Sequence, residues 1–414
     1  MNLSLLILVG VFLVIAFRKI GGIPVKIWQA MLAGATLALL TRQIAPLTAL
    51  QAIDLDVMVF LFGMFVVGEA LIMSGYLSAL AYSGVHRIHS TEGLVAAILL
   101  GGGLGSAMLM NDTLAIVGTP LVLRLAREHR LDPHLLLMAL ALAITTGSVM
   151  SPIGNPQNLL IAIEGPVPSP FLTFIQFLAF PTFLNLVLVY LALRVLMPAS
   201  FHQRLLPHSV ARVTDSDLAR LAQWSVLIML LLVGCKMTRV ALDLPFDIRL
   251  SAIALGASAP LLLLSPHRLT LLRRVDWPTL VFFAAMFILM ASVWQTGILQ
   301  NWTNELHMNL NTIPAVLGLS LSVSQLISNV PLVALYLPLV GEGHDSVTPL
   351  MALAAGSTIA GNLFILGAAS NVIIIQRAEE EGQTLSFWTF ARIGIPLTCL
   401  QTLIYWAYLS WILQ

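Results

Sequence analysis

The stretch DLDVMVFLFGMFVVGEALIMSG, residues 54–75, has a second copy in DWPTLVFFAAMFILMASVWQTG, residues 276–297. The two copies align at a constant offset of 222 residues, which pairs Gly75 with Gly297. Each copy contains an apolar run close to the length of about 20 residues that a membrane-spanning helix needs. The chain therefore contains a duplicated membrane-buried segment.

Two further segments are also duplicated. MNDTLAIVGTPLV, residues 110–122, corresponds to SNVPLVALYLPLV, residues 328–340, and residues 138–162 correspond to residues 351–375. The pairs that align are Asn111/Asn329, Pro120/Pro338, Gly154/Gly367 and Asn158/Asn371. Duplicated apolar halves with polar, glycine-containing interruptions at corresponding positions are typical of secondary transporters.

Composition excludes a soluble fold. Charged residues make up 9% of the 414 residues and hydrophobic residues 58%, whereas soluble domains contain about 25% charged residues. We therefore predict an all-α polytopic membrane protein with about 11 transmembrane elements. The net charge of +1 provides no basis for nucleic-acid binding. Cys235 and Cys399 lie in apolar runs, which predicts neither a disulfide framework nor a metal site.

The apolar runs predict where the chain crosses or enters the membrane. The predicted spans are 3–17, 27–42, 53–82, 93–110 with 114–127, 135–162, 171–196, 222–241, 248–265, 278–299, 311–328 with 330–341, 349–376 and 384–413. The first run has no basic residue before it and no small-residue cleavage site after it, so we interpret it as a span and not as a signal peptide.

The distribution of basic residues predicts the topology, because Lys and Arg in short loops mark the cytoplasmic side. The predicted hairpin 92–130 has basic residues at both ends, which places both ends in the cytoplasm. Its counterpart, the hairpin 311–341, is flanked by residues 301–311 and 341–345, which contain no Lys or Arg, so its ends are expected outside. These halves form an inverted-topology repeat with two opposed re-entrant hairpins, an external N-terminus and a cytoplasmic central loop. The exceptions to the rule, in or near external loops, are Arg42, Lys236 and Arg239.

The repeat also predicts the domain organisation. The expected parts are N-terminal scaffold helices at 1–50; repeat 1 at 51–197, with its hairpin at 92–130 and a broken helix at 135–163; a cytoplasmic linker at 198–223; scaffold helices of the second half at 224–271; and repeat 2 at 272–414, with its hairpin at 311–341 and a broken helix at 349–377.

Four polar interruptions mark the candidate site: Asn111–Thr113, Ser151–Asn158, Ser328–Pro331 and Gly367–Asn371. Gly and Pro interrupt helices, and the backbone groups they leave unpaired are tolerated at membrane depth only inside protein or along a wet cavity. Helix N-termini exposed there attract an anion, while carbonyl, Asn and Ser oxygens can bind Na⁺. Two structural alternatives stay open: an ordinary turn between complete spans for the first interruption, and a kinked structural helix for the second.

Two acidic residues are candidates for ion coupling. Asp112 is the only acidic residue in the four interruptions, and an intramembrane carboxylate is by default a functional hypothesis, as a proton carrier or a Na⁺ ligand. Its alternative is a carboxylate at a solvated hairpin tip. Glu69 lies within a span and is either a second proton site or a carboxyl group satisfied between helices.

At these interruptions, residues 25–413 resemble the ion transporter superfamily. This group includes arsenite permeases, divalent anion–sodium symporters, citrate-transporter-like proteins and one class of sodium–proton antiporters. The symporters have a Ser-Asn-Thr triplet at each hairpin tip; here the tips read Asn111-Asp112-Thr113 and Ser328-Asn329-Val330, so Asp112 and Val330 depart from that pattern. The Asn-Asp pair followed by Pro120 is more similar to the arsenite permeases and antiporters, and SPIGNPQNLLIA resembles uncharacterised bacterial anion permeases.

The resemblance implies a site, a mechanism and partners. Residues expected to bind substrate are Asn111, Asp112, Thr113, Gly154, Asn155, Asn158, Ser328, Asn329, Gly367, Ser370 and Asn371. Asp112 and Glu69 are expected to couple transport to an ion, and Na⁺ is expected near the side chains of Asn111, Asn155, Asn329 and Asn371. The family also implies elevator movement of a transport portion and a scaffold portion that forms a homodimer.

We therefore predict a secondary active transporter, not an enzyme, that moves a small anion or oxyanion across the cytoplasmic (inner) membrane. Arsenite or antimonite efflux is the leading case, coupled to H⁺ or Na⁺, with no cofactor. The alternatives are a Na⁺/H⁺ antiporter on the same scaffold and a di- or tricarboxylate symporter. The predicted partners are the small ion and the lipid bilayer. The chain has no ATP-binding motif, so a separate ATPase subunit is possible but not required.

Overall fold

The computed structural model describes residues 3–17, 19–20, 23–85, 88–201, 205, 213–242, 244, 247–298, 312–340 and 347–412. Within these ranges the fold is helical except for two short strands, β1 (Lys19–Ile20) and β2 (Ile23–Pro24), which pair antiparallel. The predicted all-α class is confirmed. The loops 301–311 and 341–345, on which the opposite orientation of the second hairpin was predicted, lie outside the described residues.

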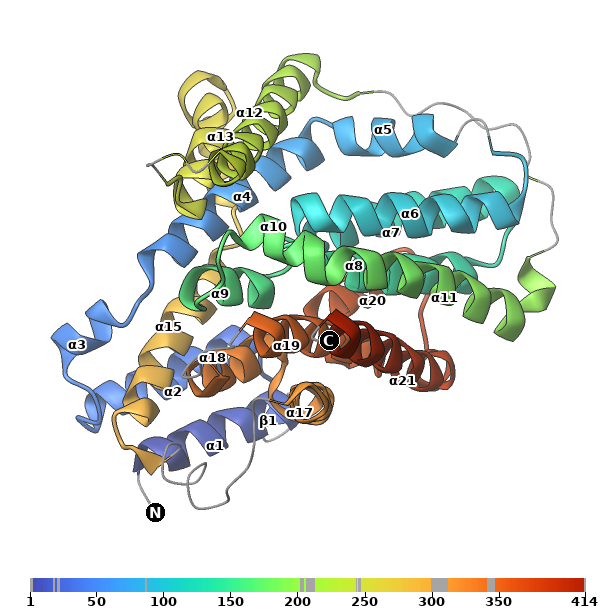
Figure 1. Ribbon diagram of the computed structural model, residues 1–414. Coiled ribbons are helices and arrows are strands. Elements are labelled where there is room, and N and C mark those ends of the chain that lie inside the picture. The colour runs from blue at the N-terminus through green and yellow to red at the C-terminus, as the bar shows by residue number, and fades with distance from the viewer. Residues whose placement is uncertain are drawn as a thin grey trace.

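Helices account for the rest of the regular structure (Figure 1). In chain order they are α1 (Leu3–Phe17), α2 (Ile27–Leu40), α3 (Pro46–Gln51), α4 (Leu55–Met73), α5 (Tyr76–Val85), α6 (Thr91–Leu109), α7 (Asn111–His129), α8 (Pro133–Ser148), α9 (Pro156–Glu164), α10 (Pro170–Phe174), the π-helix η1 (Ile175–Ala179), α11 (Phe180–Leu196), η2 (Pro198–Ser200), α12 (Ser216–Ala241), α13 (Leu250–Leu264), α14 (Arg268–Arg274), α15 (Trp277–Trp294), α17 (Ile313–Ile327), α18 (Asn329–Val340), α19 (Val347–Ile359), η3 (Ala360–Asn362), η4 (Ile365–Gly367), α20 (Ala369–Glu380) and α21 (Phe387–Ile412).

The helices repeat in the same order in the two halves. α1 to α4 correspond to α12 to α15, and α6 to α9 correspond to α17 to α20. The backbone repeats in detail, because Gly75 and Gly297 have φ values of 70° and 69°, and Met110 and Ser328 have values of 68° and 74°. The predicted repeats began at residues 51 and 272. The order of the helices shows that the duplication begins earlier in each half, at α1 and at α12.

Packing crosses between the halves. α2 packs against α15, and its counterpart α13 packs against α4. α7 packs against α20, and α18 packs against α9 in the same reciprocal way. Figure 1 shows α4 beside α12 and α13 at the upper left, α15 beside α1 and α2 at the lower left, and the hairpins and broken helices beside both groups. Each half therefore covers apolar faces of the other.

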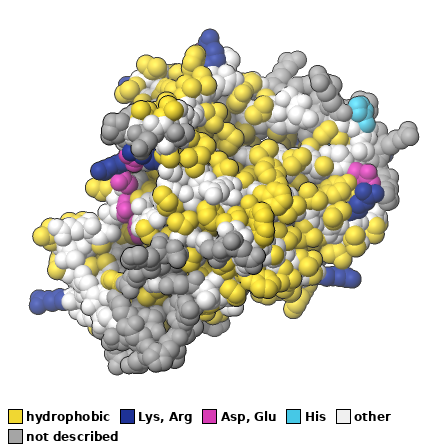
Figure 2. Space-filling view, in the orientation of Figure 1, with side chains coloured by type: hydrophobic (Ala, Val, Ile, Leu, Met, Phe, Trp, Pro, Cys, Tyr) yellow, Lys and Arg dark blue, Asp and Glu magenta, His cyan; other side chains and the backbone are white. Residues whose placement is uncertain are grey.

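The surface fits a membrane environment. Among the described residues, six helices are long and apolar enough to cross a membrane, and further apolar helices are shorter. Leucines of α12 such as Leu227, Leu230 and Leu231 are exposed. Figure 2 shows a broad hydrophobic area on one face, with charged side chains near its edges.

Three predicted boundaries were wrong. The predicted span 53–82 is two helices, because Gly75 ends α4 in a left-handed conformation. α12 begins inside the predicted linker 198–223, because the Asp215 side chain accepts hydrogen bonds from the N–H groups of Asp217 and Leu218 and caps the helix there. The Asn111–Thr113 segment, predicted as the hairpin turn, is the first turn of α7.

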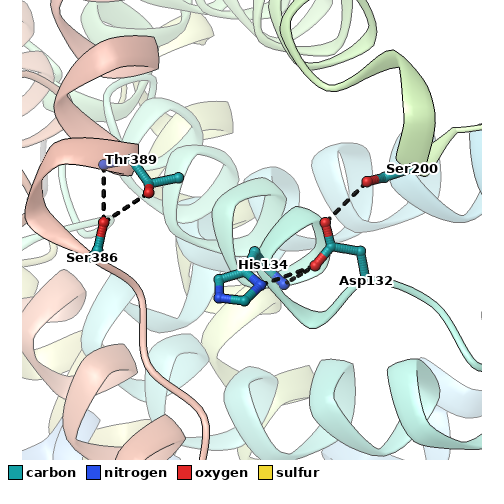
Figure 3. A network of polar contacts seen from close by, with 5 residues as sticks. All are labelled: Asp132, His134, Ser200, Ser386 and Thr389. Atoms are coloured by element: carbon teal, nitrogen blue, oxygen red, sulfur yellow. Dashed lines mark hydrogen bonds and ion pairs between the residues drawn. The ribbon is translucent and has the colours of Figure 1, made fainter.

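A polar contact fixes the beginning of the first broken helix (Figure 3). The Asp132 carboxylate accepts from the His134 N–H at 2.9 Å and from the Ser200 hydroxyl at 2.9 Å. Because Ser200 follows α11, this contact holds the end of α11 against the N-terminus of α8. Ser386 forms a separate cap on α21 by accepting from the Thr389 N–H.

Candidate functional site

Each hairpin turns through a single residue. Met110 alone separates α6 from α7, and Ser328 alone separates α17 from α18. Both have a positive φ with an extended ψ (138° and 159°), a conformation that is uncommon and strained for residues other than glycine. The tight turn makes Asn111 and Asn329 the first residues of their helices, so the first turn lies at Met110 and not at Asn111–Thr113. The alternative of a turn between two complete spans stays open, because α6 is long and apolar enough to cross a membrane.

The two asparagines at the tips have amide oxygens without partners. Asn111 is 6% exposed and Asn329 is 7% exposed. The Oδ1 atoms of both are buried and, among the described residues, accept no hydrogen bond. Leaving a buried polar group unpaired costs about 1–3 kcal/mol. Equivalent unpaired oxygens at equivalent positions are therefore candidates for contact with a ligand.

The first break, between α8 and α9, uses its own amides to hold the chain. The Asn155 Oδ1 accepts the Asn158 N–H at 2.8 Å and caps α9. Asn158 Nδ2 lies 3.1–3.2 Å from the carbonyl oxygens of three residues at the end of α8 and just beyond it. Asn155 and Asn158 are thus already engaged by protein groups, and their role as substrate ligands stays a prediction.

Gly154 joins the first hairpin to this break. Its carbonyl oxygen accepts the Asn111 N–H at 2.9 Å. A Cβ at this position would lie 2.4 Å from the Ser148 carbonyl oxygen, so only glycine fits. The close approach gives Gly154 a defined structural role beside the hairpin tip.

The second break, between α19 and α20, follows the same plan with one difference. Asn371 Nδ2 donates to the Gly361 carbonyl oxygen at 2.9 Å, which is the counterpart of the bond from Asn158 to Ser148. Within the part of the chain that the structure describes, Asn371 Oδ1 and the Ser370 hydroxyl have no partner although both residues are buried. The second break therefore keeps free oxygens that the first one does not.

Residues that the sequence reasoning missed connect the four elements. The Thr358 hydroxyl, at the end of α19, lies 3.2 Å from Asn155 Nδ2 and 3.3 Å from Asn158 Oδ1, so it joins the two breaks. Gln325 of the second hairpin donates to the Ala360 carbonyl oxygen at 2.8 Å. Thr358 aligns with Thr145 at the repeat offset of 213, a signal available in the sequence.

A second polar bridge strengthens the junction. Asn362 Nδ2 donates to the Thr146 hydroxyl and to Gln401 Oε1, both at 3.0 Å. Gln401 Nε2 completes the triangle by donating to the same Thr146 hydroxyl at 3.0 Å. These bonds tie α8, the second break and α21 together behind the candidate site.

The two acidic candidates have different surroundings. Asp112 is partly exposed in the first turn of α7 and makes no side-chain hydrogen bond or ion pair to another described residue. The Thr113 hydroxyl beside it lies against Gly68 of α4, where an added Cβ would be 2.9 Å away. Glu69 is only 17% exposed and lies 3.4 Å from Arg274 of α14. That ion pair favours the structural alternative for Glu69, while its coupling role stays a prediction.

The electrostatics of the site come from oxygens and helix ends. The four interruptions contain no Lys or Arg. α7, α9, α18 and α20 all begin there, and helix N-termini carry partial positive charge and free N–H groups. Asn111, Asn329 and Asn371 retain amide oxygens suited to Na⁺, whereas the Asn155 oxygen is occupied by the Asn158 N–H.

Comparison with known proteins identifies the fold and the family. The sequence profile of the citrate transporter family matches residues 11–347. An uncharacterised transporter of Mycobacterium bovis is 29% identical over 84% of both chains. The silicon efflux transporter of Oryza sativa is 27% identical over 95% of both chains. The human P protein is also 27% identical, and the match covers 97% of this chain and 59% of that protein.

A solved structure has the same fold. The YdaH transporter of Alcanivorax borkumensis, described as having an unusual topology, superposes with a TM-score of 0.57 over 99% of this chain and 98% of its own, at 17% sequence identity. The apolar helices, the duplicated halves and these matches identify a multi-pass membrane protein that acts as a secondary transporter and not as an enzyme. The chain belongs to the citrate transporter family, within the ion transporter superfamily.

Proposed function

We propose that this protein exports a small oxyanion or its neutral oxyacid, with arsenite or antimonite as the leading case. The observation that carries the proposal is the pair of buried, unpaired Oδ1 atoms of Asn111 and Asn329 at equivalent hairpin tips. Asn371 and Ser370 provide further free oxygens. Hydroxyl groups of a neutral oxyacid can donate hydrogen bonds to such oxygens, and an anionic form can accept from the helix N-termini.

The absence of basic residues from the four interruptions argues against a multiply charged substrate. A citrate or dicarboxylate ion carries two or three charges, and burying unpaired charge is costly. One helix N-terminus contributes only about 0.3–1 kcal/mol to binding an anion. Arsenite is mostly neutral at pH 7 and avoids this cost, and the related rice protein is a silicon efflux transporter. Cys235 and Cys399 lie outside the interruptions, so recognition would use oxygen and nitrogen atoms.

Coupling would use H⁺ or Na⁺. Asp112 is the candidate proton carrier, and the free oxygens near the tips are candidate Na⁺ ligands; Glu69 is a weaker candidate because it pairs with Arg274. We propose an elevator mechanism in a homodimer of the cytoplasmic membrane, with the N-terminus outside and the central loop inside. α4 packs far more extensively against α13 than against α7 of the first hairpin, and α15 packs more extensively against α2 than against α18 of the second, which supports a scaffold distinct from the hairpins. No cofactor or ATPase subunit is required.

One second candidate has an observation in its favour. Asp112 lacks a protein partner among the described residues although it lies one residue from the buried Asn111. A carboxylate in this setting could exchange Na⁺ for H⁺ without any anion. Sodium–proton antiport on the same scaffold is therefore the alternative, and it is separable by experiment.

Flux in proteoliposomes tests the proposal. Vesicles with a trapped pH dye would receive gradients of arsenite, sulfate, citrate, Na⁺ or Li⁺. A response to arsenite that Asn111→Ala and Asn329→Ala each reduce at least about tenfold, with Ser322→Ala on the exposed face of α17 as the control, supports the proposal. A response to Na⁺ or Li⁺ alone identifies the antiporter. Normal arsenite flux in both asparagine variants eliminates the tip site.

A further inference from the structure

A polar cavity lies away from the hairpin tips. It has a volume of about 390 Å³ and opens where α12 ends and α13 begins, opposite the connection between α9 and α10. The charged side chains that line it are Asp56, Lys236, Arg239, Asp247 and Arg249. Figure 2 shows basic and acidic side chains together at the left edge of the molecule, beside the end of α12.

The charges in this cavity are not balanced. Lys236, only 7% exposed, donates from Nζ to Asp247 Oδ1 at 2.8 Å and to the Ile248 carbonyl oxygen at 2.6 Å. Arg249 is 76% exposed and lies 3.5 Å from Asp56. Counted over the lining residues that the structure describes, three cations face two anions. The described residues that line the cavity therefore carry one more positive than negative charge.

Arg239 carries that surplus. Its Nε atom is buried and has no hydrogen-bond partner among the described residues. A guanidinium group presents its donors in a planar fork that matches two oxygens of a phosphate group. A buried donor left unpaired in this way is unfavourable, so an anion bound at Arg239 would remove both the surplus charge and the unpaired donor.

The apolar side of the cavity adjoins a pocket of only about 10 Å³. This pocket shares Ser169, Lys236 and Val240 with the larger cavity. Its other lining side chains are Phe171, Leu172 and Met237. Leu242, directly beyond the end of α12, is also largely exposed. This pocket is too small for an acyl chain, so a ligand with an anionic group in the larger cavity would lay its hydrocarbon chain over the apolar side chains at the rim.

The sequence contains an independent sign of an unusual site. Lys236 and Arg239 are two of the basic residues that depart from the expected charge distribution, because they fall in or near a loop that is expected outside. Basic residues normally mark the cytoplasmic side of a membrane protein, so a basic pair expected on the external side must serve another role. Binding of an anionic membrane component provides one.

We propose that this cavity binds the headgroup of an anionic phospholipid, with its phosphodiester at Arg239 and the beginning of an acyl chain along Phe171 and Met237. A phosphodiester carries one negative charge at neutral pH, which balances the extra positive charge of the described lining residues. Since the site joins α12 to the α9–α10 connection, the lipid bridges the helix pair α12–α13 and the segment that follows the first break.

Native mass spectrometry of the purified full-length protein tests the lipid site. Phosphatidylglycerol, phosphatidylcholine or inorganic phosphate would be added to delipidated protein. We expect phosphatidylglycerol to bind the wild-type protein and Arg239→Gln to weaken this binding at least about tenfold. Arg239→Lys should restore part of the binding. The control Arg220→Gln, an exposed change on the same helix, should leave the binding unchanged. Thermal unfolding without lipid would establish that each variant is folded. If Arg239→Gln is not folded, Val240→Trp, which places a large side chain in the cavity, replaces it.

Four results would overturn the proposal. Phosphatidylglycerol binding that survives Arg239→Gln places the lipid elsewhere. Equal binding of phosphatidylcholine, or saturation by millimolar inorganic phosphate alone, shows that the cavity does not select an anionic lipid. A dimer that dissociates in Arg239→Gln with its lipid count unchanged assigns the cavity to a subunit interface. None of these results bears on the asparagines at the hairpin tips, so the transport proposal is tested separately.

Discussion

Substituting the equivalent residues Asn158 and Asn371 by alanine should separate stability from transport. Asn158 Nδ2 holds three backbone carbonyl groups of the first break, and its two N–H groups can satisfy two of them fully. Asn371 Nδ2 holds one. Alanine at 158 leaves the Val149 carbonyl oxygen and the Thr358 hydroxyl donor without their partners, whereas the Ser148 and Ser151 carbonyl oxygens keep backbone N–H donors. At about 1–3 kcal/mol for each buried group left unpaired, we expect a loss of about 2–6 kcal/mol for Asn158→Ala and about 1–3 kcal/mol for Asn371→Ala.

Transport should follow the opposite order. Asn371→Ala removes a free buried oxygen, whereas the Asn158 oxygen is already bonded to the Thr358 hydroxyl. We would measure unfolding of each purified variant in detergent and the initial flux per folded protein in proteoliposomes. Asn158→Ala should have the lower stability and Asn371→Ala the lower flux. Equal losses of stability, or a greater loss of flux in folded Asn158→Ala, would refute the assignment of one amide to structure and the other to the site.

Three further predictions concern packing, coupling and pH. Gly154→Ala should destabilise the protein by several kcal/mol or prevent folding, because the added methyl would lie 2.4 Å from a backbone carbonyl oxygen. In the control variant Gly318→Ala, the added methyl meets no atom within 4 Å, so that variant should unfold at the wild-type temperature. Asp112→Asn should abolish ion-coupled flux while the protein stays folded, since its carboxylate has no partner among the described residues; retention of a proton-coupled response in this variant would exclude Asp112 as the carrier. The hydrogen bond from Lys236 holds the pKa of Asp247 below its usual value. The ion pair therefore stabilises the folded protein fully above the unfolded-state pKa of about 3.9, and this stabilisation is lost as pH falls through the lower folded-state pKa. Melting curves between pH 6 and pH 3 should accordingly show a smaller acid-induced decrease for Asp247→Asn than for the wild type, and equal decreases would contradict the ion-pair effect.

The duplicated sequence was sufficient to predict the general architecture. Strict offsets located the equivalent helices, and glycine and proline located both helix breaks. The hairpin tips were harder, because Met110 and Ser328 adopt positive φ values that neither residue type predicts. The helices therefore begin at Asn111 and Asn329, not after them.

The sequence also predicted only part of the candidate site. Sequence identifies polar residues at a break but not which of their atoms are already bonded. Asn155 and Asn158 resemble Asn371 in the sequence, yet their amides bond to Thr358 from the other half. Contacts between residues about 200 positions apart depend on the crossing of the two broken helices, and no local pattern encodes that crossing.

The reciprocal packing of the halves has a consequence for biosynthesis. When a ribosome has completed α11, α4 and α7 are made but their partners α13 and α20 are not. At that point of synthesis the first half lies in the membrane with apolar and polar faces uncovered. We expect this step of synthesis to depend most on insertion factors. A half-length version of the chain could cover the same faces only by associating with a second copy of itself. In the present chain one polypeptide supplies both copies, and each half provides the helices that cover the other.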